Sequence, residues 1–248
     1  MASPSAASRR RPPVRVAVAS DQKLVAEAVV AALRNRSFEP LLVRWPTTVP
    51  HLVAKASRRR RTFRRSVGAP PDVGLLLSDL TRMEHVLAAQ TIVSSLPLPW
   101  LVMAGIVRGP AWGALYESGA NFVVPSETGL IEVTELLTDL SAGQRPSAQR
   151  RDRRELIQGW QNFAARREDL TARLQTLTER EEEILHQLHQ GLAVRNIASR
   201  SAVTEATVRS QVKAILKKLD VNSQMAAVAV YQGVLTDSTD MDAMAAPG

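Results

Sequence analysis

Cysteine is absent from the 248-residue sequence, which excludes disulfide bonds, thiolate metal ligands and cysteine nucleophiles. Long apolar runs are absent too: no stretch approaches the roughly 20 apolar residues that a membrane span needs. The start of the sequence is basic, but it lacks the apolar run of a secretory signal. These absences lead us to expect a cytoplasmic protein that makes no membrane contact.

Signatures of catalysis and of cofactor binding are also missing. The sequence has no GxxxxGK[ST], and no GxGxxG follows an expected strand. His186 and His189 lie three residues apart in a helical segment, but no third ligand is evident, and surface histidines are the simpler interpretation. No combination of acid, base and nucleophile stands out. We therefore expect no enzyme activity, no cofactor and no metal site.

Positive charge is in excess, with a formal net charge of +8, but it is concentrated in two tracts. Residues 1–15 hold four arginines, and KASRRRRTFRRS at 55–66 holds seven basic residues; neither tract contains an acid. The rest of the chain has 21 basic against 24 acidic residues. A solvated tail and loop is the simpler interpretation, and contact with nucleic acid or an acidic partner is the alternative. The role of the arginines at 58–65 stays open.

From residue 14 to 140, short apolar runs alternate with segments of helical periodicity. The expected strands are VRVAVAS, EPLLVRW, DVGLLLS, PWLVMAG and NFVV. They are apolar throughout, which is typical of strands buried on both faces. Five such strand and helix units predict a five-stranded parallel sheet covered by helices.

A polar linker and a long helix are expected between residues 141 and 176. SAGQRPSAQRRD at 141–152 is polar and contains proline, which is typical of a linker. Large residues then follow at alternating spacings of four and three, with one arginine among them: Leu156, Trp160, Phe163, Arg167, Leu170, Leu174 and Leu177. This seam predicts either a helix packed on its own domain or a coiled coil between two copies of the chain.

Residues 177–236 predict four short helices. TEREEEILHQLHQG begins with a capping box formed by Thr178 and Glu181 and stops at a glycine. AVRNIASRS is the second helix, and the tight turn SAV leads into a third helix that Thr204 caps. Ser223 caps the fourth. Two short helices joined by a tight turn form a helix-turn-helix.

The third of these helices carries two different faces. Its apolar stripe consists of Val208, Val212, Ile215, Leu216 and Leu219. Arg209, Lys213 and Lys217 form a basic row on an adjacent side. A helix fits the major groove of DNA and contacts base edges with its N-terminal half, while residues farther along serve phosphates or solvent, as we expect of Lys217 and Lys218. The candidate DNA-contacting residues are Thr204, Thr207, Arg209, Ser210, Gln211, Lys213 and Lys217.

From Leu177 to Val228 the sequence resembles, without a gap, the LuxR/NarL-type helix-turn-helix of bacterial transcription regulators. Matching features include Leu177-Thr178, Arg180-Glu181, Gly191, Ile197-Ala198, Thr207-Val208 and Lys218-Leu219. The resemblance implies DNA contacts at Arg209, Ser210 and Lys213, and a dimer surface on the fourth helix. The sequence departs from the family pattern at Ala193, Val194, Gln211 and Gln224. The first two departures remove a capping side chain from the second helix.

The N-terminal half resembles a response-regulator receiver domain in the order of its elements, and VRVAVASDQKLVAEAVVAAL resembles the first strand and helix of one. Receivers phosphorylate an aspartate, with acidic Mg²⁺ ligands, a hydroxyl and a lysine nearby. Here the acid pair is Ser20-Asp21, the acceptor position falls on Asp79 or Leu77, the hydroxyl is replaced by Ala104, and Pro125-Ser126 stands in place of the lysine. An atypical receiver is implied, which is either structural or senses a ligand. The candidate pocket residues are Ser20, Asp21, Asp79 and Ala104, with Gly105 and Arg108 beside them.

These patterns predict five segments: a disordered basic tail at 1–13, an atypical receiver-like domain at 14–140 with a basic insertion at 55–70, a linker and long helix at 141–176, a DNA-binding domain at 177–236 and a disordered tail at 237–248. The expected fold is a flavodoxin-like α/β domain followed by an all-α, four-helix LuxR-type domain.

The expected function is sequence-specific DNA binding by a dimeric, nucleoid-associated transcription regulator on an inverted-repeat operator. The expected dimer residues are Leu156, Trp160, Phe163, Met225 and Val228. Contact with RNA polymerase and a small-molecule ligand at the receiver-like pocket are further expectations. Two alternatives are a conventional regulator switched by phosphorylation and a regulator that acts by protein contact through the helix at 156–177.

Overall fold

The computed structural model describes residues 12–46, 69–144 and 150–235. The expected C-terminal tail lies outside these ranges, as do nearly all of the expected N-terminal tail and of the basic insertion at 55–70. The short helix expected at TVPHLVAKAS also lies outside them. No helix in the described ranges has both the length and the apolar character of a membrane span.

Two compact units make up the chain. The first comprises Met1–Asp79, Ala88–Gly105 and Leu115–Gln149, and the second comprises Leu80–Leu87, Ile106–Ala114 and Arg150–Gly248. The second unit therefore includes two short segments from within the range 14–140 that we expected to form one receiver-like domain.

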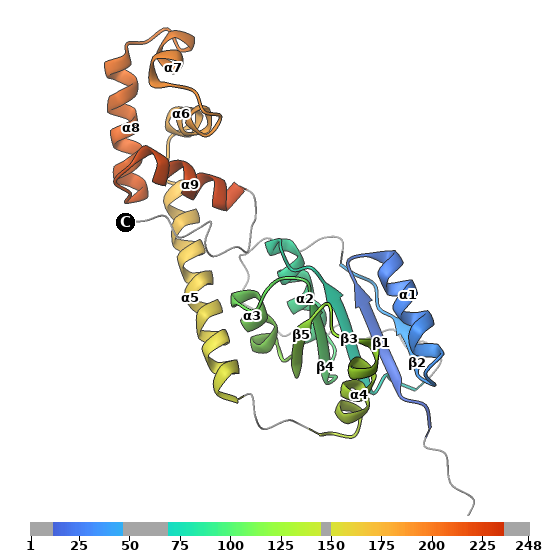
Figure 1. The fold of residues 1–248 in the computed structure, drawn as a ribbon. Coiled ribbons are helices and arrows are strands. Elements are labelled where there is room, and N and C mark those ends of the chain that lie inside the picture. The colour runs from blue at the N-terminus through green and yellow to red at the C-terminus, as the bar shows by residue number, and fades with distance from the viewer. Residues whose placement is uncertain (1–11, 47–68, 145–149, 236–248) are drawn as a thin grey trace, which may run out of the picture. The chain divides into compact units, whose positions relative to one another are not determined.

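The first unit is built on a parallel sheet of five strands, as the alternating pattern predicted (Figure 1). The strands are β1 (Arg15–Ser20), β2 (Glu39–Leu42), β3 (Val73–Ser78), β4 (Trp100–Ala104) and β5 (Phe122–Pro125). Their order in the sheet is β2-β1-β3-β4-β5, and every neighbouring pair is parallel. This is the doubly wound, flavodoxin-like order.

The helices between the strands are α1 (Lys23–Arg34), α2 (Met83–Ser95), α3 (Pro110–Ser118) and α4 (Leu130–Ser141). The central strands are buried along their length, and all five residues of β4 are inaccessible to solvent or nearly so. Val16, Leu75 and Leu101 of three adjacent strands form one core with Leu33 of α1 and Leu137 of α4. Burial on both faces explains why these strands are apolar throughout.

In the second unit, α5 (Arg150–Leu174) begins two residues before the end of the expected linker. Gly113 of α3 lies so close to α5 that a Cβ atom at this position would be 2.0 Å from the carbonyl oxygen of Leu156. Trp160 and Phe163 are each only 6% exposed, and their rings stack with centroids 5.8 Å apart. Both rings are therefore largely covered within one chain, as expected for a helix that packs on its own domain. Their expected place at a dimer surface stays a prediction.

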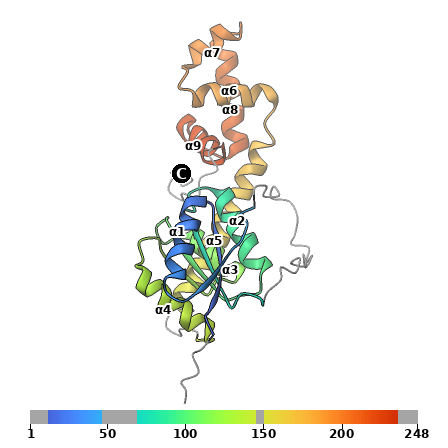
Figure 2. The ribbon, with the colours of Figure 1, turned by 90° about the vertical axis from the view of Figure 1, so that its right-hand side faces the viewer.

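Four helices follow α5, as expected: α6 (Glu179–His189), α7 (Val194–Arg200), α8 (Glu205–Leu219) and α9 (Gln224–Leu235). Figures 1 and 2 show α7 at the N-terminal end of α8 and α9 at its C-terminal end. Apolar residues from all four helices form the core of this part, among them Ile184, Ile197, Val208 and Tyr231.

The helix caps follow the sequence prediction closely. Thr178 accepts a hydrogen bond from the backbone N–H of Glu181, and the Glu181 carboxylate accepts one from the backbone N–H of Thr178 at 2.7 Å. Ser223 accepts a hydrogen bond from the backbone N–H of Ala226. Ala193 gives α7 no side-chain cap, as its departure from the family pattern predicted. The turn between α7 and α8 places Ala202 at a φ of 52°.

Glu181 has a second function in the fold. Its side chain is 10% exposed, and its Oε2 accepts a hydrogen bond from Lys218 Nζ of α8 at 2.6 Å. Burial by itself raises the pKa of Glu181, but the hydrogen bonds from Lys218 and Thr178 outweigh burial, so this pKa lies below its ordinary value. Lys218 also donates to the carbonyl oxygen of Thr176. The ammonium group of Lys218 thus ties α8 to the start of α6.

Replacing Ala202 by glycine should stabilise the C-terminal helices. A side chain is disfavoured at positive φ, and glycine removes this cost, so Ala202→Gly should raise the free energy of unfolding by about 0.5–1 kcal/mol. Hydrogen exchange of the α8 amides measures the change. The matched control is Ala165→Gly in the middle of α5, which should lower stability by a similar amount. A loss of protection in α8 for Ala202→Gly would contradict the prediction.

Replacing Glu181 by glutamine should destabilise the same helices in a pH-dependent way. At pH 7 the loss of the charged hydrogen bond to Lys218 should lower the free energy of unfolding by about 1–3 kcal/mol. Because the pKa of Glu181 is depressed in the folded state, its contribution is present above the unfolded pKa and is lost as the pH falls through the folded pKa. Urea unfolding at pH 7 and in acid should therefore show a deficit that shrinks in acid.

The control for this change is Glu183→Gln, because the side chain of Glu183 is 52% exposed and, among the described residues, pairs only with Arg180 and Gln187. Its effect should stay below roughly 0.5 kcal/mol. Equal effects of the two substitutions, or a Glu181→Gln deficit that does not change with pH, would contradict the prediction.

Candidate nucleic-acid interface

The start of α8 is shaped by two threonines. Thr204 has extended backbone angles, and its hydroxyl oxygen accepts a hydrogen bond from the backbone N–H of Thr207 at 3.1 Å. The two hydroxyl oxygens lie 2.9 Å apart. Both side chains are exposed, so the N-terminal end of α8 is capped and still open to solvent.

The two faces of α8 are separated as the sequence predicted. Val208, Ile215 and Leu219 are at most 1% exposed and share one apolar core with residues of α6, α7 and α9. Arg209, Ser210, Lys213 and Lys217 are exposed, while Gln211 is half-buried. Of the residues expected to contact DNA, Arg209, Ser210 and Lys213 are thus exposed in the first turns and the middle of α8, while Lys217 is exposed in its last turn.

The basic residues of this face differ in their partners. Arg209 donates from Nη2 to Glu205 Oε2, one helical turn earlier, at 2.8 Å. Lys213 and Lys217 form no ion pair with any residue in the described ranges. Lys218, which we expected to face phosphates or solvent, instead binds Glu181 and the carbonyl oxygen of Thr176. Its position one residue after Lys217 rotates it away from the basic row and towards α6.

Two further cations that the sequence analysis did not single out lie on α7. Arg195 and Arg200 are exposed and form no ion pair with another residue of the described chain. They flank Ile197 and Ala198, which are buried. The signal was present in the sequence: an arginine on either side of a buried apolar pair in a short helix must face outward. The first helix of a helix-turn-helix crosses the DNA backbone, which suits a phosphate contact from these side chains.

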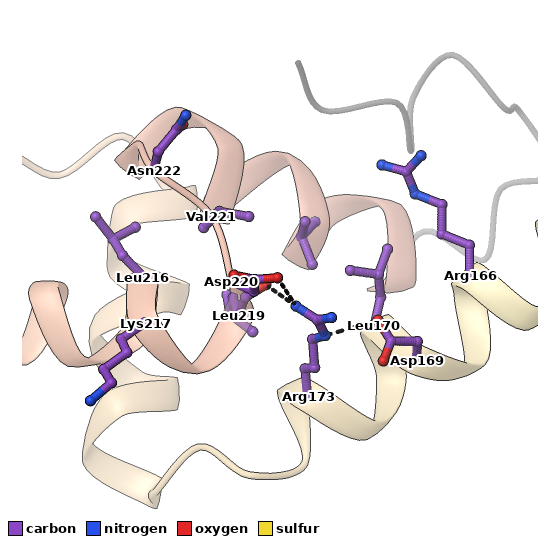
Figure 3. Close-up of a pocket in the computed structure, with 11 residues that line it drawn as sticks. Arg166, Asp169, Leu170, Arg173, Leu216, Lys217, Leu219, Asp220, Val221 and Asn222 are labelled. Atoms are coloured by element: carbon purple, nitrogen blue, oxygen red, sulfur yellow. Dashed lines mark hydrogen bonds and ion pairs between the residues drawn. The ribbon is translucent and has the colours of Figure 1, made fainter. Parts of the chain in front are cut away.

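A groove of about 590 Å³ lies between α5, the end of α8 and the residues that follow it (Figure 3). Arg173 occupies its centre, with Nε 2.8 Å from Asp169, and with Nη1 3.0 Å from Asp220 and 3.2 Å from the carbonyl oxygen of Leu219. The hydrogen bond to Asp220 raises the pKa of Arg173 above its ordinary value. The central charges of the groove are therefore already paired, and they hold α5 against the C-terminal end of α8.

The receiver-like residues meet at the carboxyl edge of the sheet in the first unit. Ser78 Oγ donates to Asp21 Oδ2 at 2.7 Å, and Ser20 Oγ accepts from the backbone N–H of Gln22 at 3.1 Å. Asp79 follows the end of β3, and Gly105 lies against it. Leu77 pairs with Ser20 across the sheet and packs against the core.

Ala104 ends β4 and is 1% exposed. Of the pocket residues predicted from the sequence, Ser20, Asp21, Asp79 and Ala104 therefore all follow or end neighbouring parallel strands. Two serine hydroxyls, the carboxylates of Asp21 and Asp79 and a buried methyl group therefore line this edge.

Comparison with known proteins assigns the C-terminal helices. Residues 175–231 match the family described as "Bacterial regulatory proteins, luxR family". The nitrate/nitrite response regulator protein NarP of Escherichia coli is 44% identical over 55 residues, which cover 22% of this chain but only 26% of NarP. The transcriptional regulatory protein LnrK of Bacillus subtilis is 26% identical over 227 residues, which cover 89% of this chain and 98% of LnrK.

Solved structures similar to the chain include two response regulators. ChrA, from a heme-sensing two-component system, is 20% identical with a TM-score of 0.37, over 90% of this chain and 98% of ChrA. RcsB from Salmonella enterica serovar Typhimurium, bound to a promoter, is 17% identical with a TM-score of 0.37, over 90% of this chain and 98% of RcsB. The family match over residues 175–231, which hold α6, α7, α8 and most of α9, identifies these residues as a helix-turn-helix domain of the LuxR family of bacterial regulatory proteins.

Proposed function

We propose that this protein is a sequence-specific, double-stranded-DNA-binding transcription regulator that acts as a homodimer on an inverted-repeat operator. One observation carries the proposal: α8 buries its apolar side and turns Arg209, Ser210, Lys213 and Lys217 outward in a LuxR-family domain. Base edges face the N-terminal half of such a helix, and phosphates face its flanks. A protein that binds chromosomal DNA acts in the cytoplasm, in association with the nucleoid.

Dimerisation belongs to this proposal because a single helix-turn-helix buries little surface on DNA, and two half-sites give specific binding. We assign the contact to α9, where Met225 is 82% exposed and Val228 is half-buried beside it. An exposed, flexible apolar side chain suits a contact between two copies. A regulator that acts only through the seam of α5 is less well supported, because Trp160 and Phe163 are already covered.

We further propose that the receiver-like N-terminal domain does not carry out aspartate phosphorylation. Ser20 stands where receivers place one of their acids, and Ala104 stands where they place a hydroxyl. The Ser78 hydroxyl occupies one carboxylate oxygen of Asp21, and Leu77 packs against the core. Asp21 and Asp79 remain close enough to share a cation, but the second acid of the pair, the hydroxyl and the lysine that the reaction uses are missing from the matching positions.

Selection of bound genomic DNA fragments with the purified protein tests DNA recognition. The parent protein should enrich a short inverted repeat, and the double variant Arg209→Ala with Lys213→Ala should lose this enrichment. Within the enriched site, Arg209→Ala alone should cost roughly 1–3 kcal/mol of discrimination at one or two base pairs.

The matched control is Arg166→Ala, which removes an exposed cation from α5 rather than from α8. It should leave the enriched sequence unchanged. Equal enrichment by the parent and the Arg209/Lys213 double variant would show that α8 does not recognise the sequence.

Incubation with a small-molecule phosphodonor and Mg²⁺, followed by intact-mass measurement, tests the receiver-like part. We expect no species heavier by one phosphoryl group, while a conventional response regulator treated in parallel should show one. A phosphorylated species that disappears in Asp79→Asn would instead establish a conventional regulator switched by phosphorylation.

A further inference from the structure

Glu205 heads the basic row of α8. It is the first residue of the helix, and Arg209, Lys213 and Lys217 follow it at successive intervals of four. Residues four apart in a helix lie on the same side, so one acid and three cations share one stripe. The Glu205 side chain is 47% exposed and that of Arg209 is 70% exposed, and the two are joined at 2.8 Å. The outward face therefore presents an ion pair at the end that approaches the bases.

Local helix stability does not require this particular acid. An acid in the first turn is favoured by the helix macrodipole, and Glu179 occupies the same position in α6. An exposed pair at this spacing contributes only about 0.3–0.5 kcal/mol. The distinguishing feature of Glu205 is its place on the stripe that carries the candidate base contacts, where a negative charge opposes attraction to phosphates.

Arg209 can keep this partner and still contact a base. A guanidinium group has five N–H donors in a fixed planar fork, and guanine accepts two of them at O6 and N7. A carboxylate that holds one Nη atom fixes the direction of the remaining donors and reduces the freedom lost on binding. On DNA without the correct base, the same carboxylate stays close to the phosphates without a compensating contact.

We propose, on the basis of the proposed function, that Glu205 is a specificity-determining residue that positions Arg209 for its base and weakens binding to non-cognate DNA. Its carboxylate acts in two ways. It orients Arg209 through the ion pair, which favours the operator, and it repels phosphates, which disfavours every other sequence. Discrimination between the operator and other DNA is then larger than Arg209 alone would give.

The test compares binding of the full-length parent and Glu205→Gln to the selected operator and to a duplex of scrambled sequence. Glutamine keeps the size of the side chain and removes its charge. Binding of Glu205→Gln to the scrambled duplex should tighten by roughly 3–10-fold at low salt, because one repulsive charge near the phosphates is removed. Binding to the operator should change less, so the ratio of the two affinities should fall by at least about 3-fold.

Two further variants separate positioning from bulk charge. Glu168→Gln removes an exposed acid from α5, with the same change in net charge, and should leave the ratio unchanged. In an Arg209→Ala background, Glu205→Gln should still tighten binding to the scrambled duplex, but it should no longer reduce preference for the base that Arg209 contacts. The helix content and melting temperature of every variant should match those of the parent.

An unchanged ratio for Glu205→Gln, or an equal loss of base preference with and without Arg209, would overturn the inference while the parent still binds its operator. If the parent itself shows no preference for any sequence, the proposed function fails first, and the inference fails with it.

Discussion

The packing of Val208, Ile215 and Leu219 into the core shared with α6, α7 and α9 fixes the rotation of α8 about its own axis. These side chains are almost fully buried, and turning them into water would cost on the order of 1.5–3 kcal/mol each. This constraint determines which side chains α8 presents to solvent, because a helix that buries one stripe must expose the opposite one. The outward position of Arg209 and Lys213 therefore follows from apolar packing rather than from any contact of their own.

Some cations of the C-terminal helices are partly buried and hold helices together, while others are exposed to solvent. Lys218 lies between α8 and α6, where Glu181 holds it, and Arg173 links α5 to the end of α8 through Asp220. Such charges need partners because their contact with water is reduced. Lys213 remains exposed and needs none, so it keeps its charge available for an anionic ligand. The partly buried cations are thus paired within the fold, and the exposed ones keep a charge that attracts anions.

The parallel sheet gathers polar side chains at one edge. Parallel strands bring Ser20, Asp21 and Asp79 to one edge whatever their chemistry, because the carboxyl ends of neighbouring strands meet there. The chemistry of this edge is set by the side chains, such as the Ser78 hydroxyl that donates to Asp21 and the buried methyl group of Ala104. The backbone frame and the chemistry of the edge are separable, so one fold can hold different sites.

Local signals in the sequence determined the elements of this protein, their caps and the two faces of α8. Apolar runs that alternate with helical segments predicted the parallel sheet, and the caps at Thr178 and Thr204 predicted helix starts. Spacings of three and four residues predicted that Val208 and Arg209 belong to different faces of α8. These features depend on residues a few positions apart, so the sequence contains their cause.

Tertiary structure alone decided which residues meet across long stretches of chain. The seam of α5 is equally suited to a second copy or to its own domain, and only the packed structure covers Trp160 and Phe163 within one chain. From the sequence we expect the same role for Lys218 as for its neighbour Lys217, but in the folded chain Lys218 binds Glu181, 37 residues earlier. Periodicity specifies that a face is apolar or charged, but the partner of that face is set by the relative placement of whole helices, which depends on many distant contacts at once.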